Sequence, residues 1–200
     1  MATPKRGLKT LRRRRAPAQP APPEFAPSPA SRELSDFEFT LIILTYGFQR
    51  WVVSCMEAAN VRGLGALDVL VLHTVNHRAR NRRLSEICMV LNIDDTHLVA
   101  YALKKLVAAG LVAVSRRGRE RHYQTTPAGD AACLDYRHVR EKFLVPSLSW
   151  LSDSGSVLPN MAAFLRTMTG LYDQAGRFAT AASLEQPKPP PVRTKLVRTK

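Results

Sequence analysis

The sequence is poor in the residues that build disulfide, metal and catalytic sites. It has three cysteines, Cys55, Cys88 and Cys133, an odd number spread far apart along the chain. They therefore predict neither a disulfide framework nor a zinc-ligand pattern, which fits a reducing compartment. No glycine-rich phosphate loop, no Ser-His-Asp set and no catalytic carboxylate pair stands out. We therefore expect no enzyme, no cofactor and no metal site.

Long uninterrupted apolar runs are also missing. The longest candidate, around residues 39–48, is too short to span a membrane as a helix. The basic N-terminus leads into prolines rather than into the apolar stretch of a secretory signal. We therefore expect a cytoplasmic protein without a membrane partner.

Acidic residues are few beside basic ones, and the positive surplus is uneven. The 200 residues include 30 Lys and Arg against 16 Asp and Glu, a net charge of +14. Residues 1–30 hold seven basic residues and one acid, and residues 187–200 hold five and none. Within the body, residues 81–123 hold eight basic and four acidic residues. Localised positive charge of this kind indicates a polyanionic partner, most simply double-stranded DNA.

Both ends of the chain have the composition of disordered tails. Residues 1–33 and 186–200 are rich in proline and basic residues and carry too few large apolar groups to form a core. Each tail is either simply solvated or a basic arm that adds non-specific DNA affinity, with residues 12–15 near the minor groove. We expect one folded domain at 34–185, with a DNA-binding core at about 66–126.

Two long apolar helices are predicted at the ends of this domain. The first is capped by Ser35 or Asp36 and runs to about Asn60, and the last runs from about Pro159 to Ser183. In both, apolar residues recur at alternating spacings of four and three: Phe37, Leu41, Leu44, Phe48, Trp51, Cys55 and Ala58, then Met161, Leu165, Met168, Tyr172, Ala175, Ala179 and Ala182. Faces this broad must be buried, so each helix needs a further partner.

The middle of the chain predicts a helix-turn-helix. A helix at about 66–78 is followed by a short helix capped by Ser85 that ends at Leu91. Asn92 suits the left-handed residue that closes a helix. Asp94 or Asp95 then caps a helix that runs to residue 109 and stops at Gly110. So tight a turn between two helices is typical of this motif.

A basic hairpin follows in the stretch VAVSRRGRERHYQTTPAG, residues 112–129. We predict a strand, a turn at Gly118, and a second strand. Thr126 and Pro127 then supply the cap and first residue of a helix to about Val145. The predicted fold is therefore mainly α with a small β-wing (α+β): a winged helix-turn-helix flanked by N- and C-terminal helices.

The order of these elements resembles the MarR family of bacterial transcription regulators over about residues 35–183. The resemblance is strongest in Leu-x-x-x-Gly-Leu-Val at 106–112, the basic wing, and Thr-Thr-Pro-Ala-Gly at 125–129. The wing carries Arg-Arg-Gly-Arg-Glu-Arg in place of the Asp-Arg-Arg common in the family. The resemblance implies a homodimer formed by the terminal helices, a pseudo-palindromic operator, and a place on the bacterial nucleoid.

The helix at 95–109 is expected to enter the major groove with its N-terminal end. Val99, Leu103 and Leu106 face the core, whereas Lys105 and Ala108 lie on the opposite side. Ala100 offers a small surface for a thymine methyl group. Wing arginines are candidates for phosphate or minor-groove contact, with Glu120 orienting one of them, and Arg83 for backbone contact. The predicted DNA-binding residues are Thr96, His97, Ala100, Tyr101, Lys104, Arg116, Arg117, Arg119, Arg121 and Arg83, with Arg119 and Arg121 first among the arginines.

Two weaker candidates are better explained as structural residues. His73 and His77 lie four apart on one predicted helix, but no third metal ligand is evident. Cys55 lies in an apolar helix, where a buried structural thiol is favoured over an oxidant sensor.

The leading hypothesis is a dimeric, sequence-specific DNA-binding regulator that represses by occluding a promoter. A small-molecule effector of unknown identity would weaken binding by changing the spacing of the two winged domains. The alternatives are a non-specific architectural DNA-binding protein driven by the tails, and a winged helix that serves only as a protein-interaction module.

Overall fold

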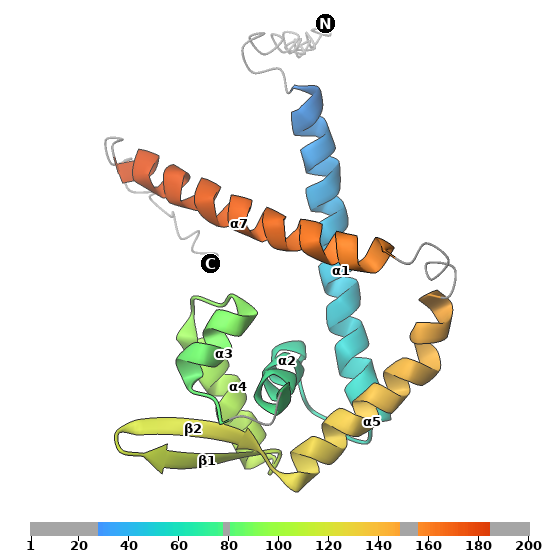
Figure 1. Cartoon of the computed structure of the whole chain (residues 1–200), viewed down its shortest axis with the longest axis vertical. Coiled ribbons are helices and arrows are strands. Elements are labelled where there is room, and N and C mark those ends of the chain that lie inside the picture. Colours follow the sequence, from blue (N-terminus) through green and yellow to red (C-terminus); the bar gives the residue numbers. More distant parts are fainter. Residues whose placement is uncertain (1–27, 78–80, 149–155, 185–200) are drawn as a thin grey trace, which may run out of the picture. The chain divides into compact units, whose positions relative to one another are not determined.

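The computed structural model describes residues 28–77, 81–148 and 156–184, and Figure 1 shows their helices and strands. The chain divides into two units, Met1–Val53 and Ser54–Lys200, which are described separately below. The predictions for residues 1–27 and 185–200, including the basic segment at 12–15, lie outside the described residues.

Helix α1 spans Pro29–Ala58 and begins earlier than expected. Ser28 accepts a hydrogen bond from the backbone N–H of Ser31 at 3.1 Å, so Ser28 caps the helix and Pro29 takes its first position. The prediction of a cap at Ser35 or Asp36 is therefore wrong by about two turns, and α1 includes residues 29–33, which were expected in the tail.

The length of α1 also changes the expectation about membranes. Among the described residues, α1 is the one helix long and apolar enough to cross a membrane by length and composition, although only 17% of its apolar window is buried. The sequence contains no long uninterrupted apolar run here because isolated polar residues break the run without making the helix polar. Helices that pack on a second chain have the same composition, so a membrane span does not follow from this property.

Three helices form the centre of the second unit: α2 (Ala66–Asn76), α3 (Leu84–Leu91) and α4 (Thr96–Ala108). Their facing side chains are fully buried; they are Val69, Val71, Leu72, Val75, Ile87, Val99, Leu103 and Leu106. Lys105 Nζ of α4 also donates to the Asp68 carboxylate of α2 at 2.6 Å, and Gly65 N–H donates to the same oxygen at 2.7 Å. Lys105 therefore ties two helices together, although its place on the helical wheel predicted a solvent-facing residue.

The turn between α3 and α4 follows the local sequence signals. Asn92 is left-handed, with φ 53° and ψ 47°, and Ile93 N–H donates to the Cys88 carbonyl at 3.0 Å. Asp95 caps α4 by accepting from His97 N–H at 2.9 Å. The start of α3 was predicted less well: Arg83 is the cap residue, and the Glu86 carboxylate accepts its backbone N–H at 3.2 Å. Ser85 therefore lies inside the first turn rather than capping it.

The wing is an antiparallel hairpin of β1 (Val112–Arg117) and β2 (Glu120–Thr125). Val114 pairs with Tyr123, Arg116 with Arg121, and Arg117 with Glu120. Gly118 opens the two-residue turn with φ 63°, a conformation that costs glycine little. Arg82 and Tyr123 also exchange two backbone hydrogen bonds of 2.9 Å, so the segment before α3 lies against β2.

The junction between the wing and the next helix explains one motif physically. Helix α5 spans Pro127–Phe143, and Thr126 caps it by accepting from Gly129 N–H at 3.1 Å. Thr126 Oγ1 also donates to the Gly110 carbonyl at 2.6 Å. A Cβ on Gly129 would overlap the Leu111 carbonyl oxygen. The Gly-Leu pair at 110–111 and the Thr-Pro-Ala-Gly run at 126–129 therefore pack against each other, which explains why both occur together in the sequence.

A short 3-10 helix, η3 (Val145–Leu148), follows α5, and α7 covers Val157–Leu184. Helix α7 has no buried residue. The large apolar side chains exposed along it are Leu158, Met161, Phe164, Leu171, Tyr172, Phe178 and Leu184.

Candidate nucleic-acid interface

One face of α4 is free of the core. Thr96, His97 and Lys104 are exposed, Tyr101 is 71% exposed, and Ala100 is half-buried. The predicted α4 residues therefore lie on an accessible surface, beginning in the first turn of the helix. Asp95 is occupied as the helix cap, and the exposed Asp94 next to it adds a negative charge that opposes phosphate at this end.

The register of the wing decides how its arginines are presented. Because side chains alternate along a strand, Arg116 and Arg121, which are paired, share one face of the hairpin, and Arg117 lies on the other face with Glu120. Arg119 lies in the turn itself. All four arginines are exposed, and among the described residues none has a carboxylate partner. Two like charges placed directly opposite each other destabilise a hairpin slightly, a cost that a bound anion would offset.

Arg83 differs from the wing arginines because its charge is already paired. It contacts Glu86 at 2.9 Å and Glu120 at 3.2 Å. Its backbone N–H and its side chain both hold the pKa of the Glu86 carboxyl below its usual value. Glu120, which was expected to orient a wing arginine, pairs with Arg83 and with His122, at 3.7 Å. Arg83 therefore links the start of α3 to the wing.

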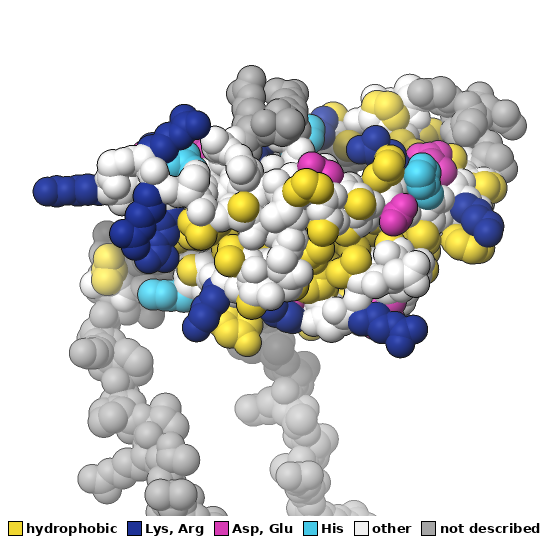
Figure 2. Space-filling view, turned by 90° about the horizontal axis from the view of Figure 1, so that it is seen from below, with side chains coloured by type: hydrophobic (Ala, Val, Ile, Leu, Met, Phe, Trp, Pro, Cys, Tyr) yellow, Lys and Arg dark blue, Asp and Glu magenta, His cyan; other side chains and the backbone are white. Residues whose placement is uncertain are grey.

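The surface view shows where positive charge gathers on the winged unit. In Figure 2, Lys and Arg side chains gather at the end that the β1–β2 hairpin occupies in Figure 1. Apolar side chains lie between this end and the opposite one. An exposed basic tip beside an exposed helix is the arrangement by which winged helices grip a phosphate backbone and reach base edges.

Sequence reasoning missed two features of this surface. Leu98 of α4 is 51% exposed. The sequence held a signal for this, because Leu98 lies three residues before Tyr101 and residues three apart are neighbours on a helix surface. The pairing of Arg82 with Tyr123 joins residues about forty positions apart, for which no local pattern exists.

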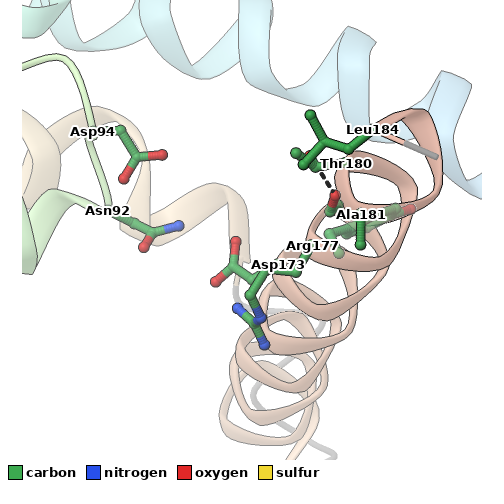
Figure 3. Close-up of a pocket in the computed structure, with 9 residues that line it drawn as sticks. Asn92, Asp94, Asp173, Arg177, Thr180, Ala181 and Leu184 are labelled. Atoms are coloured by element: carbon green, nitrogen blue, oxygen red, sulfur yellow. Dashed lines mark hydrogen bonds between the residues drawn. The ribbon is translucent and has the colours of Figure 1, made fainter. Parts of the chain in front are cut away.

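The described residues of the second unit line several hollows, of which two bear on the candidate site. One, of about 330 Å³, is lined by Leu70, His73, Thr74, His77, Arg82, Val90 and Leu91, and the buried His73 Nε2 and Arg82 Nε have no hydrogen-bond partner among the described residues. The other, of about 700 Å³, includes Asp94 of the α3–α4 turn and Asp173 and Arg177 of α7 (Figure 3). Because no residue of α7 is buried, we assign no ligand to the second hollow.

The histidine and cysteine candidates have structural surroundings. The His73 ring meets Tyr136 edge-on at 4.4 Å, and burial lowers the pKa of His73, with Arg140 and Arg137 acting in the same direction. Cys55 is buried and its thiol donates to the Tyr136 carbonyl at 3.4 Å. Burial raises the pKa of Cys55, and raises that of Cys133 to about 11. Within the described part of the chain, no three His, Cys, Asp or Glu residues are placed to hold a metal ion.

Known proteins match this arrangement. Residues 64–129 match the family model of a winged helix DNA-binding domain. No curated protein sequence matches the chain. The transcriptional regulator BldR from Sulfolobus solfataricus is 18% identical, with a TM-score of 0.56 over 70% of this chain and 99% of that one. A MarR family regulator from Neisseria meningitidis is 16% identical, with a TM-score of 0.55 over 72% and 98%.

A third solved structure, reduced AbfR bound to DNA, is 16% identical, with a TM-score of 0.56 over 70% of this chain and 96% of that one. At such identities the similarity concerns the fold, and it confirms the predicted mainly α fold with its two-stranded wing. Residues 64–129 are therefore similar to a winged helix DNA-binding domain, and the chain has the fold of the MarR-family regulator from Neisseria meningitidis.

Proposed function

We propose that this chain is a transcription regulator that binds double-stranded DNA as a homodimer and represses by occluding a promoter. The observation that carries the proposal is the unpaired basic wing beside the exposed face of α4, within a domain matched by a DNA-binding family model. The operator would be pseudo-palindromic, because two identical reading domains related by a two-fold axis meet two related half-sites. Such a protein would act in the bacterial cytoplasm, on the nucleoid.

The roles divide between positioning and reading. Arg116, Arg119 and Arg121, with a smaller share for Arg117, would contact phosphates or the minor groove. Thr96, His97, Tyr101 and Lys104 would reach base edges or phosphates from α4, and Ala100 would lie against a thymine methyl group. Arg83, whose charge is paired with two glutamates, would hold the wing and α3 together for this task.

Dimerisation is supported by apolar surface that the single chain leaves exposed. In α1 the exposed large apolar residues include Phe39, Ile42, Ile43, Leu44, Tyr46 and Phe48, and in α7 every described residue is exposed or half-buried. A symmetric second copy would cover both helices with the same kind of surface. Soluble monomers rarely expose apolar patches of this extent.

Effector control would act through the spacing of the two winged domains. The hollow beside His73 and Arg82 supports an effector site, because two buried nitrogens there lack a partner among the described residues. Its volume of about 330 Å³ lies at the small end of ligand pockets.

The test compares specific with non-specific binding. Full-length chain, and a chain without residues 1–27 and 185–200, are titrated against the promoter of their own gene and against random duplex DNA of equal length. A regulator retains its preference for one sequence in both forms. Loss of most affinity with the tails, without any preference beforehand, would support the architectural alternative. Absence of salt-dependent DNA binding by the full chain would support the protein-interaction module.

A further inference from the structure

The reading helix α4 lacks the side chains that most often specify bases. Its sequence, THLVAYALKKLVA, contains no arginine, asparagine or glutamine. These three residues supply the bidentate hydrogen bonds by which proteins recognise guanine and adenine in the major groove. Lys104 carries the one cation on the exposed face, since Lys105 is held by Asp68 at 2.6 Å. Hydrogen-bonding readout by this helix is therefore sparse.

The same helix exposes apolar surface that the core does not use. Leu98 is 51% exposed and Tyr101 is 71% exposed, whereas Val99, Ala102, Leu103 and Leu106 fill the core. Leu98 and Tyr101 are three residues apart and therefore neighbours on the helix surface. Both lie in the first half of α4, the half that enters the groove in helix-turn-helix domains. Lys104 and the wing arginines supply the positive charge that would hold this apolar surface against DNA.

One base presents a matching group. Among the four bases, only thymine carries an apolar substituent on its major-groove edge, the 5-methyl group. We propose that α4 selects its operator through thymine methyl groups that contact Leu98 and Tyr101, with Ala100 adding a smaller contact. This inference rests on the proposed function and names the base that the domain recognises. Half-sites bound by this protein therefore contain thymines at the positions that face the first two turns of α4.

The expected loss of DNA affinity follows from the apolar area of one thymine methyl group. Burying one methyl-sized apolar group changes an equilibrium by about fourfold. Replacing a contacted thymine by uracil, which removes the methyl group and keeps every hydrogen-bonding atom, should weaken binding by about that factor. Replacing several contacted thymines should multiply these losses, because contacts at separate base pairs are roughly additive.

The experiment first selects preferred duplexes from a random library with the full-length chain. Single thymines of the selected site are then replaced by uracil, and the affinity ratio of thymine to uracil duplexes is measured for the wild type and three variants. Leu98→Ala should bring the ratio close to one at its own thymine. Lys104→Ala should weaken both duplexes equally and leave the ratio unchanged. Leu134→Ala removes a leucine of similar exposure, 47%, from α5 and should not change the ratio.

The outcomes separate this inference from the function on which it rests. If a preferred site emerges and full replacement of its thymines by uracil leaves the affinity unchanged, the methyl readout is wrong and the regulator remains. A ratio that is the same for Leu98→Ala and wild type at every thymine would assign the readout to residues other than Leu98. If the selection yields no preferred sequence, the proposed function fails and this inference fails with it. Circular dichroism of the variants confirms that these exposed substitutions leave the fold intact.

Discussion

The winged domain and the two long helices bury their apolar residues to very different extents. In the winged domain, residues such as Leu72, Ile87 and Leu106 are fully buried, and Lys105 has its charge paired across two helices. In α7 no residue is buried, and in α1 the fully buried residues are Val52, Cys55 and Met56, near its end.

This difference shows which part of the molecule buries its apolar surface within one chain. A domain with a closed core and capped helices is stable without a partner surface. Helices that expose a broad apolar face gain stability mainly when that face is covered. The winged domain therefore carries the proposed DNA-reading surface, and the long helices carry the apolar faces that a second copy would cover.

The largest effect is expected in the winged core. Leu106→Ala should lower the free energy of unfolding by about 2–5 kcal/mol, because a fully buried leucine leaves a cavity. Leu98→Ala is the matched control on the same helix and should change it by about 0.5 kcal/mol or less. Urea unfolding followed by circular dichroism measures both. Equal effects of the two substitutions would contradict the division of α4 into a core face and a reading face.

The next effect concerns the long helices. Leu171→Glu should weaken dimerisation by more than about 100-fold, because an unpaired charge would be buried in each copy. Arg166, Asp173 and Arg177 lie on the opposite face of α7, so Arg177→Glu should leave the dimer intact. Sedimentation at several concentrations without detergent measures the association. A wild-type chain that is monomeric, or soluble only with detergent, would show that a second copy does not cover these helices.

Substitution of the wing arginines should reduce DNA affinity and its salt dependence more than substitution of the paired Arg83. The double substitution Arg119→Ala and Arg121→Ala should reduce the magnitude of the slope of log affinity against log salt by about two for each wing bound to DNA. It should also lower the affinity by about 30-fold per wing at 0.15 M salt. Arg83→Ala should change the slope little, since Arg83 is engaged by Glu86 and Glu120 rather than by a phosphate. Fluorescence anisotropy at four salt concentrations provides the slopes. A larger change with Arg83→Ala would reverse the assignment.

The smallest effect is a pH dependence from His73. Burial lowers the pKa of His73 in the folded chain, so its contribution to stability is present above the unfolded pKa, about 6.5, and is lost as the pH falls. The loss is at most about 1.4 kcal/mol per pH unit for one proton. His73→Phe keeps a ring beside Tyr136 and should remove this component between pH 5 and 7. An unchanged pH slope in His73→Phe would show that folding does not lower the pKa of His73.

Local signals in the sequence predicted the winged domain well. Asn92, Gly110, Gly118 and the Thr126–Pro127 pair each specify a backbone conformation within a few residues, and the structure has a turn or cap at each of them. The start of α1 had the same type of signal in Ser28 and Pro29, but the apolar periodicity further along drew the predicted start to Ser35.

Features that depend on distant residues could not be predicted. The ion pairs of Arg83 with Glu120 and of Lys105 with Asp68 each join residues 37 positions apart. Their side chains meet only after the helices and the wing have packed. Helical periodicity placed Lys105 on the solvent side because it does not show where the neighbouring helix ends. Exposure of Leu98 likewise depends on how α4 lies against α2 and α3.

The most direct test of the account is hydroxyl-radical footprinting, which shows the nucleotides of a selected duplex that the full-length chain protects. The mass of the complex, measured in parallel, gives the number of chains bound. We predict two chains on one duplex and two protected segments whose centres lie about 10 base pairs apart, or a multiple of that spacing. Uniform protection along the duplex, or a single chain on a single protected segment, would contradict this account. It requires two winged domains that each bind a half-site and that are joined because α1 and α7 of the two copies cover each other's exposed apolar faces.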